Sequence, residues 1–166
     1  MSVDQKLALK CKLRDRPNPD GRGFVLPTGT GVMGYHLMRV ITTDDTPTLM
    51  VDTDTGLEYI ELRDNSLYTM RFDLLGVQTG GTDGTVGDSS LTIGCGAVKR
   101  LDGASTATVV DYNWNWYYDG GTGSWDMDVD ADTTNGGVSC TVYGDVDKTV
   151  LWELAIYLEI GMKIEA

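Results

Sequence analysis

Four aspartates at alternate positions form the densest group of possible metal ligands in the sequence: Asp126, Asp128, Asp130 and Asp132. Calcium prefers several carboxylate oxygens, but the EF-hand spacing fails here, because Ala131 replaces the required glycine and Gly137 the bidentate glutamate. Along a strand, alternate carboxylates lie about 6.5–7 Å apart, which suits a row facing water better than one chelate. We therefore expect no metal and no cofactor, with a cation on these aspartates as the alternative.

Two further patterns have a chemical interpretation. Gly29, Gly31 and Gly34 have the glycine spacing of a dinucleotide-binding loop, but that loop needs a helix after it, and the sequence continues as a strand. His36 is the single histidine, so it is the one candidate for histidine-dependent catalysis. A pair of carboxylates for glycoside chemistry leaves no sequence signature. We expect a turn at the glycines and no enzymatic activity.

A cluster of aromatic residues is a further candidate site. Its members are Trp114, Trp116, Tyr117 and Tyr118, within Asn113–Tyr118. We expect this segment to lie outside a regular strand. Trp and Tyr are enriched at protein interfaces, so a contact between subunits or an edge of the core is one interpretation. A stacking platform for a glycan is the other.

The segments that must position these residues alternate between apolar and polar residues. This period of two is typical of strands with one face on a core and one in water. Asn135-Gly136 indicates a two-residue hairpin turn. The pattern predicts an all-β protein, an antiparallel β-sandwich or barrel. The expected strands are 67–76, 91–100, 106–112, 125–132, 138–143 and 149–160.

The last expected strand, 149–160, has a second apolar surface. Val150, Trp152, Leu154, Ile156, Leu158 and Ile160 are expected to face the core. Leu151, Ala155 and Tyr157 then face outward and expose an apolar strip. Such strips are often covered by a partner subunit, so Leu151 and Tyr157 are candidate interface residues.

The charges are unevenly distributed along the 166 residues, which carry a net charge of −12. Residues 1–23 have six basic side chains against three acidic ones, and they are expected to form an extended arm that binds an acidic partner. These basic residues are Lys6, Lys10, Lys12, Arg14, Arg16 and Arg22. Residues 24–166 are expected to form one domain. The acidity argues against nucleic acid as a partner, and no segment predicts a membrane span.

Cysteine usage indicates a reducing compartment. Cys11, Cys95 and Cys140 are odd in number and have no metal-ligand spacing. Cys95 and Cys140 lie among apolar strand residues, so both are expected to be buried free thiols.

Several segments together resemble a β-rich domain of virion structural proteins from tailed bacteriophages. They are Tyr35–Leu49, Asn65–Phe72, Gly96–Arg100, Ser124–Gly136 and Gly144–Trp152. The resemblance implies a jelly-roll-like sandwich, a homotrimer, a structural role and no catalytic residues. Because the chain has no room for a fibre shaft, we expect a capsid decoration (cement) protein that is assembled in the host cytoplasm and bound to the major capsid protein of the virion. The alternative is a tail-fibre or tail-associated adaptor that binds host-surface glycan through Trp114, Trp116 and Tyr117.

Overall fold

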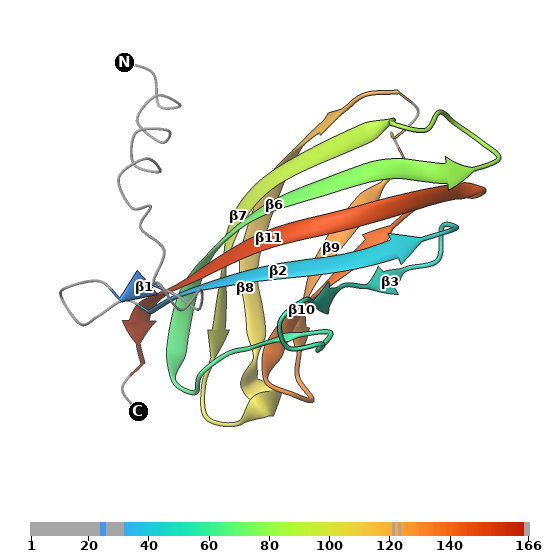
Figure 1. Ribbon diagram of the computed structural model, residues 1–166. Coiled ribbons are helices and arrows are strands. Elements are labelled where there is room, and N and C mark those ends of the chain that lie inside the picture. The colour runs from blue at the N-terminus through green and yellow to red at the C-terminus, as the bar shows by residue number, and fades with distance from the viewer. Residues whose placement is uncertain (1–23, 26–31, 121, 123, 165–166) are drawn as a thin grey trace, which may run out of the picture.

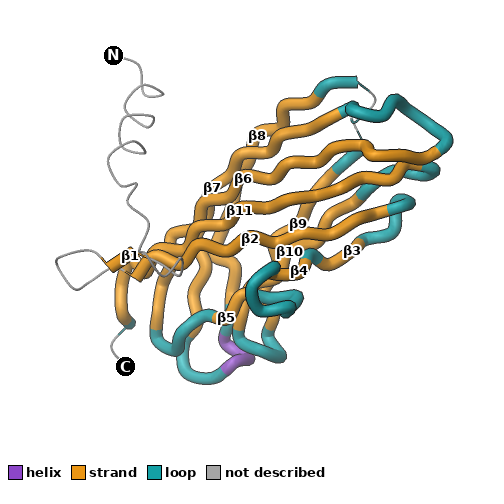
Figure 2. Tube along the Cα trace, in the orientation of Figure 1, coloured by secondary structure: helices purple, strands orange, loops and turns teal. Residues whose placement is uncertain are grey.

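The computed structural model describes residues 24–25, 32–120, 122 and 124–164. The predicted basic arm and the first two glycines of the Gly29–Gly34 motif lie outside these residues. Strands dominate the described chain, and one short 3₁₀ turn, η1 (Ala104–Thr106), interrupts them (Figures 1 and 2). Every strand pairing is antiparallel. The predicted antiparallel β-sandwich is therefore confirmed.

The larger sheet has seven strands in the order β1-β2-β11-β6-β7-β8, with β4 also paired to β2. Its strands are β1 (Phe24–Val25), β2 (Val32–Thr42), β4 (Val51–Asp52), β6 (Ser66–Gly81), β7 (Ser89–Arg100), β8 (Thr108–Tyr118) and β11 (Lys148–Lys163). Strands β2, β11, β6 and β7 run side by side as one long curved layer (Figure 1). The hairpins β6–β7 and β7–β8 are local, whereas β11 joins β2 to β6 from the far end of the chain.

The smaller sheet has four strands: β3 (Thr48–Leu49), β5 (Ile60–Glu61), β9 (Asp126–Asp132) and β10 (Gly137–Tyr143). Strand β10 is its centre and pairs with the other three. The β9–β10 hairpin lies where Asn135-Gly136 predicts it, but its loop has four residues. The reason is Asp132, whose side chain accepts hydrogen bonds from the N–H groups of Thr134 and Asn135, while its carbonyl accepts one from Gly136.

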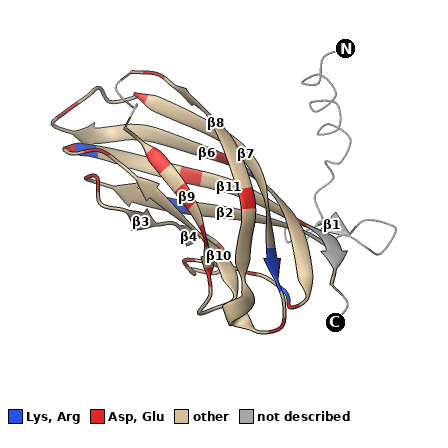
Figure 3. Ribbon diagram, turned by 180° about the vertical axis from the view of Figure 1, so that it is seen from behind, with Lys and Arg blue, Asp and Glu red and all other residues tan. Residues whose placement is uncertain are grey.

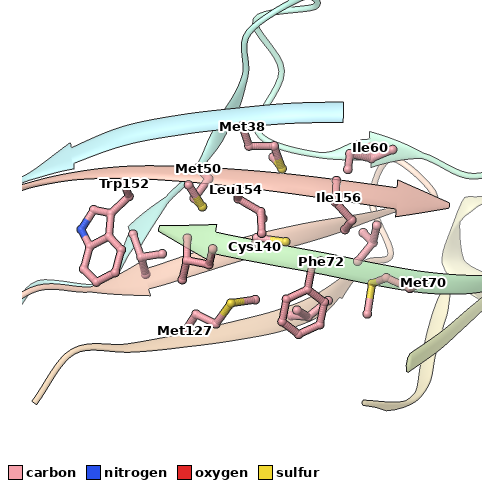
Figure 4. Packing of buried hydrophobic residues seen from close by; sticks show 14 of the residues in the cluster. Met38, Met50, Ile60, Met70, Phe72, Met127, Cys140, Trp152, Leu154 and Ile156 are labelled. Atoms are coloured by element: carbon pink, nitrogen blue, oxygen red, sulfur yellow. The ribbon is translucent and has the colours of Figure 1, made fainter. Parts of the chain in front are cut away.

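The core fills the space between the two sheets, as Figure 4 shows for part of it. The predicted inward faces of β6, β9, β10 and β11 are confirmed at Tyr68, Met70, Phe72, Leu74, Met127, Val129, Val138, Cys140, Val142, Val150, Trp152, Leu154, Ile156 and Leu158. Trp125 is also buried, although it lies just before β9. Cys140 is a buried free thiol, as predicted, and burial raises its pKa to about 12.

Strand β7 is built the opposite way from its neighbours. Its inward positions include Thr92, Gly94 and Gly96, and its apolar Leu91, Ile93 and Cys95 alternate with them on the outer face. Adjacent strands occupy the space over both glycines. A Cβ on Gly94 would lie 2.0 Å from Cζ of Phe72, and one on Gly96 would lie 2.5 Å from the carbonyl oxygen of Asp111. The prediction that Cys95 is buried is therefore wrong, because its position in the strand turns it outward.

Candidate interaction surface

The outward side chains of the larger sheet form one continuous patch, which we call the outer face. The strand register aligns these side chains in cross-strand rows over β2, β11, β6, β7 and β8. We limit the outer face to the four rows that begin at Ile41, Arg39, Leu37 and Tyr35 of β2, and the next row beyond them contains the acids Glu159 and Asp111. One row joins Arg39, Glu153, Leu75, Leu91 and Tyr117, and the neighbouring row joins Leu37, Ala155, Asp73, Ile93 and Asn115. Cross-strand neighbours on one face are about 4.5–5.5 Å apart, so these side chains contact along each row.

Large apolar side chains on the outer face remain accessible to water. Tyr35, Ile41, Leu75, Val77, Ile93 and Tyr117 are 38–58% exposed. Leu37, Leu91, Leu151, Ala155 and Tyr157 lie between them and are half-buried. Single exposed apolar residues are common on soluble proteins, but a contiguous patch of this kind marks an interaction site.

The charges within the outer face balance. Its four rows contain two arginines, Arg39 and Arg71, and two acids, Asp73 and Glu153. Arg39 and Glu153 pair directly with each other across β2 and β11. The outward positions of β9 in the smaller sheet are all aspartates, and neither β9 nor β10 has a basic residue (Figure 3). The two outer surfaces of the sandwich therefore differ in kind, one apolar and neutral, the other acidic.

The predicted interface residues of the last strand belong to the outer face. Leu151 lies between Ile41 and Val77, and Tyr157 lies between Tyr35 and Arg71. The rings of Tyr35 and Tyr157 pack with their centroids 5.1 Å apart. The strip predicted from one strand is thus part of a wider surface, and sequence reasoning missed its contribution from β6 and β7.

The aromatic cluster divides between two faces. Contrary to the prediction, Asn113–Tyr118 lies within strand β8. Trp114 and Trp116 face inward and pack against the core, where Trp114 stacks on Tyr112 at 4.9 Å between centroids. Tyr117 faces outward beside Leu91, and Tyr118 is 64% exposed at the end of the strand. One surface therefore does not present Trp114, Trp116 and Tyr117 together.

The acidic row of β9 takes part in hydrogen bonds with tyrosines. Asp128 accepts one from Tyr143 Oη at 2.7 Å and another from Tyr112 Oη at 3.4 Å. The bond to Asp128 is the main cause of the raised pKa of Tyr143, whereas burial is the main cause of the raised pKa of Tyr112. Tyr112 Oη also accepts from the Val129 N–H, which occupies part of the free edge of β9. Among the described residues, no three His, Cys, Asp or Glu side chains are placed to share a metal ion.

His36 lies beside the turn that follows β4. Its Nδ1 is 2.8 Å from Oδ2 of Asp52, a side chain that is only 3% exposed. The other oxygen of Asp52 accepts hydrogen bonds from the N–H groups of Asp54 and Thr55, both at 2.9 Å. Burial on its own raises the pKa of Asp52, but the bonds from Thr55, His36 and Asp54 outweigh it and hold the pKa below its ordinary value. The pair thus organises the turn.

A shallow pocket lies between this turn and the smaller sheet. Its volume is about 460 Å³, and Leu49, Leu57, Tyr59 and Ser139 are among the residues that line it. Two of its polar side chains, Asp132 and Asn135, hydrogen-bond to each other at 2.7 Å and so satisfy one another.

Replacing Asp52 with asparagine is expected to cost about 1–3 kcal/mol of stability at pH 7, because the amide removes the buried charge and keeps one acceptor oxygen in place of two, with an NH2 donor where Oδ2 faced His36. A carboxyl whose pKa is lower in the folded state stabilises that state above its unfolded pKa, and the benefit disappears as the pH falls through the folded value. The gap between wild type and Asp52→Asn should therefore narrow as the pH falls below about 4. Urea unfolding at pH 7 and pH 3 tests this, with the exposed Asp54→Asn as control. An equal gap at both pH values would contradict it.

Comparisons with known proteins leave the family open. No family model matches the chain, and no curated protein matches it. Among solved structures it is similar to the tailspike protein gp49 of Acinetobacter baumannii bacteriophage Fri1, a capsular polysaccharide depolymerase, with a TM-score of 0.36 and 7% identity. The similarity covers 86% of this chain and 20% of the tailspike, so the chain spans about a fifth of that protein's length. Overlap at this level does not establish a shared fold. The described residues contain no helix long and apolar enough to cross a membrane.

Proposed function

We propose that this protein is a non-enzymatic structural component of a tailed-phage particle, a homotrimer that decorates the outside of the capsid. The observation that carries the proposal is the outer face, an apolar and charge-balanced surface spread over five strands. A surface of this kind favours a protein that works by contact with other proteins. The resemblance to virion structural domains supplies the type of particle.

The remaining surfaces of the sandwich fit this role. The acidic face of β9 suits contact with water, because it carries aspartates and no basic residue. The segment 1–23 carries six basic residues and has the opposite sign to the body of the chain, so it is the part proposed to bind the capsid. Capsid contact and subunit contact then use different parts of the chain.

Binding to purified phage heads tests the function. The full chain is expected to co-sediment with heads, and a chain lacking residues 1–22 is expected to lose most of that binding. Co-sedimentation should weaken as salt rises, because screening reduces attraction between exposed charges. Unchanged occupancy by the shortened chain would overturn capsid binding through the basic segment. Binding to purified tails but not to heads would overturn capsid decoration.

A further inference from the structure

We infer that the outer face is the surface through which copies of this chain contact one another. The inference rests on the proposed function in one respect, the homotrimer, and it identifies which side chains that assembly covers. It does not depend on whether the protein binds the capsid.

Strand β7 contributes Val98 to the core of its own chain, but its other large apolar side chains, Leu91 and Ile93, are not used there. Leu91 and Ile93 point away from the sandwich, while the inward Gly94 is covered by the ring of Phe72 and the inward Gly96 by the backbone of Asp111 and Tyr112 in β8. A strand with water on its outer side ordinarily alternates the other way. The inverted alternation of β7 is the pattern expected where the outer side is also covered by protein.

The outer face is close in size to a stable subunit interface. Five strands about 4.8 Å apart and four rows about 6.8 Å apart span roughly 24 by 27 Å, or about 650 Å² before side-chain relief. Stable interfaces bury about 800 Å² on each partner, whereas the largest apolar patch of a typical monomer is about 300–600 Å². The outer face therefore provides most of the area that one stable contact between subunits needs.

The charge of the outer face indicates what binds there. The chain carries −12, so two copies that meet through acidic surfaces repel one another. The four rows of the outer face have two arginines against two acids, and the row beside them adds Glu159 and Asp111, so a second copy meets less repulsion here than at the aspartates of β9. Each Arg39–Glu153 pair also has donors and acceptors for its counterpart on another subunit. A second copy of this chain fits these properties.

Leu75 is the residue to change. It lies on β6, the central strand of the five, and its side chain is 48% exposed between Glu153 and Leu91. Because it faces outward, a polar side chain there leaves the core of a single subunit unchanged. Leu57 is a matched control, since it is 41% exposed but belongs to the turn near the shallow pocket, away from the outer face.

The experiment compares the masses of wild type, Leu75→Lys and Leu57→Lys by sedimentation. Both changes make the net charge less negative, so loss of assembly cannot come from added repulsion between acidic chains. Wild type and Leu57→Lys are expected to assemble, to about 54 kDa for the proposed trimer of 18.1 kDa chains. The dissociation constant of Leu75→Lys should rise roughly 30-fold or more, as at the centre of an interface. Ile93→Asn is a second variant on the outer face, and its dissociation constant should rise as that of Leu75→Lys does.

Three results would overturn the inference: a wild type that stays at 18 kDa, a Leu75→Lys variant that assembles like wild type, or equal dissociation of both lysine variants. Near-ultraviolet circular dichroism of the four tryptophans reports whether each variant is folded. Binding of wild type to heads is scored separately. If the protein binds the capsid but assembles through another surface, this inference is refuted and the proposed function stands. If it assembles through the outer face but does not bind the capsid, the inference stands and the proposed function is refuted.

Discussion

Replacing Trp152 with alanine is expected to lower the free energy of unfolding by about 3–5 kcal/mol, the usual cost of deleting a fully buried aromatic side chain. Trp152 has no exposed surface and belongs to β11, the strand that joins β2 to β6. Its ring packs edge-on against Trp125 at 5.1 Å and fills the space over Gly76. The cavity left by alanine would therefore lie between the two sheets, where the surrounding strands have little freedom to close it.

A smaller change separates the hydrogen bond of Trp152 from its packing. The indole Nε1 donates to Thr42 Oγ1 at 3.0 Å in a buried position. Thr42→Val keeps the shape but leaves this donor unpaired, so we expect a cost of about 1–3 kcal/mol. Urea unfolding followed by circular dichroism, at one fixed protein concentration, measures both variants. An effect of Trp152→Ala no larger than that of Thr42→Val would contradict the account of the core.

Adding one methyl group at Gly94 is also expected to lower the stability of the fold. A Cβ there would lie 2.0 Å from Cζ and 2.4 Å from Cε2 of Phe72, which is itself fully buried. The ring cannot withdraw without displacing other core side chains, so we expect a loss of about 1–3 kcal/mol or more. The measurement is the same urea titration.

Gly80 provides the matched control for Gly94. It also lies in a strand of the larger sheet, but its added Cβ would meet only Thr149, at an ordinary 3.7 Å. Gly80→Ala should therefore be neutral or slightly stabilising, because alanine loses less backbone entropy than glycine on folding. In a Phe72→Leu background the cost of Gly94→Ala should shrink, which a double-mutant cycle detects. Equal costs for the two glycine changes, or no coupling to Phe72, would refute the clash.

The strands that pack with one face only could be predicted from the sequence. In β9, β10 and β11 the apolar positions alternate without a break, and a period of two fixes which residues share a face. The turn at Asn135-Gly136 could also be placed, though its length could not. That length depends on Asp132, whose side chain and carbonyl both bind N–H groups of the loop.

The orientation of the side chains in strand β7 could not be predicted in this way. Its alternating apolar residues, Leu91, Ile93 and Cys95, suggest an inward face, but their side chains point outward. Glycine at these inward positions is explained only by the neighbouring strands, which place the ring of Phe72 over Gly94 and the backbone of Asp111 and Tyr112 over Gly96. A pattern read within one strand cannot reveal what the adjacent strand places above it.

The outer face also depends on residues that are far apart in the sequence. Its rows join residues of β2 to residues of β11, and the Arg39–Glu153 pair spans 114 positions. The sequence could therefore identify Leu151 and Tyr157 as outward and apolar, but the contribution of Leu75 and Ile93 required the register of five strands. The Asn113–Tyr118 segment is an intermediate case. Its alternation of Asn and Trp is a strand signal, which the adjacent Tyr117 and Tyr118 obscure.

The accessibility of Cys95 tests most directly whether the outer face is the contact between subunits. Its thiol lies on that face next to Arg71 and is exposed in a single chain, whereas Cys140 is buried with a pKa of about 12. In a Cys11→Ser background, a soluble thiol reagent therefore reports on Cys95. We predict slow reaction at concentrations where sedimentation shows an assembly, and fast reaction on dilution to single chains or in Leu75→Lys. Fast reaction of Cys95 in the intact assembly would contradict the account.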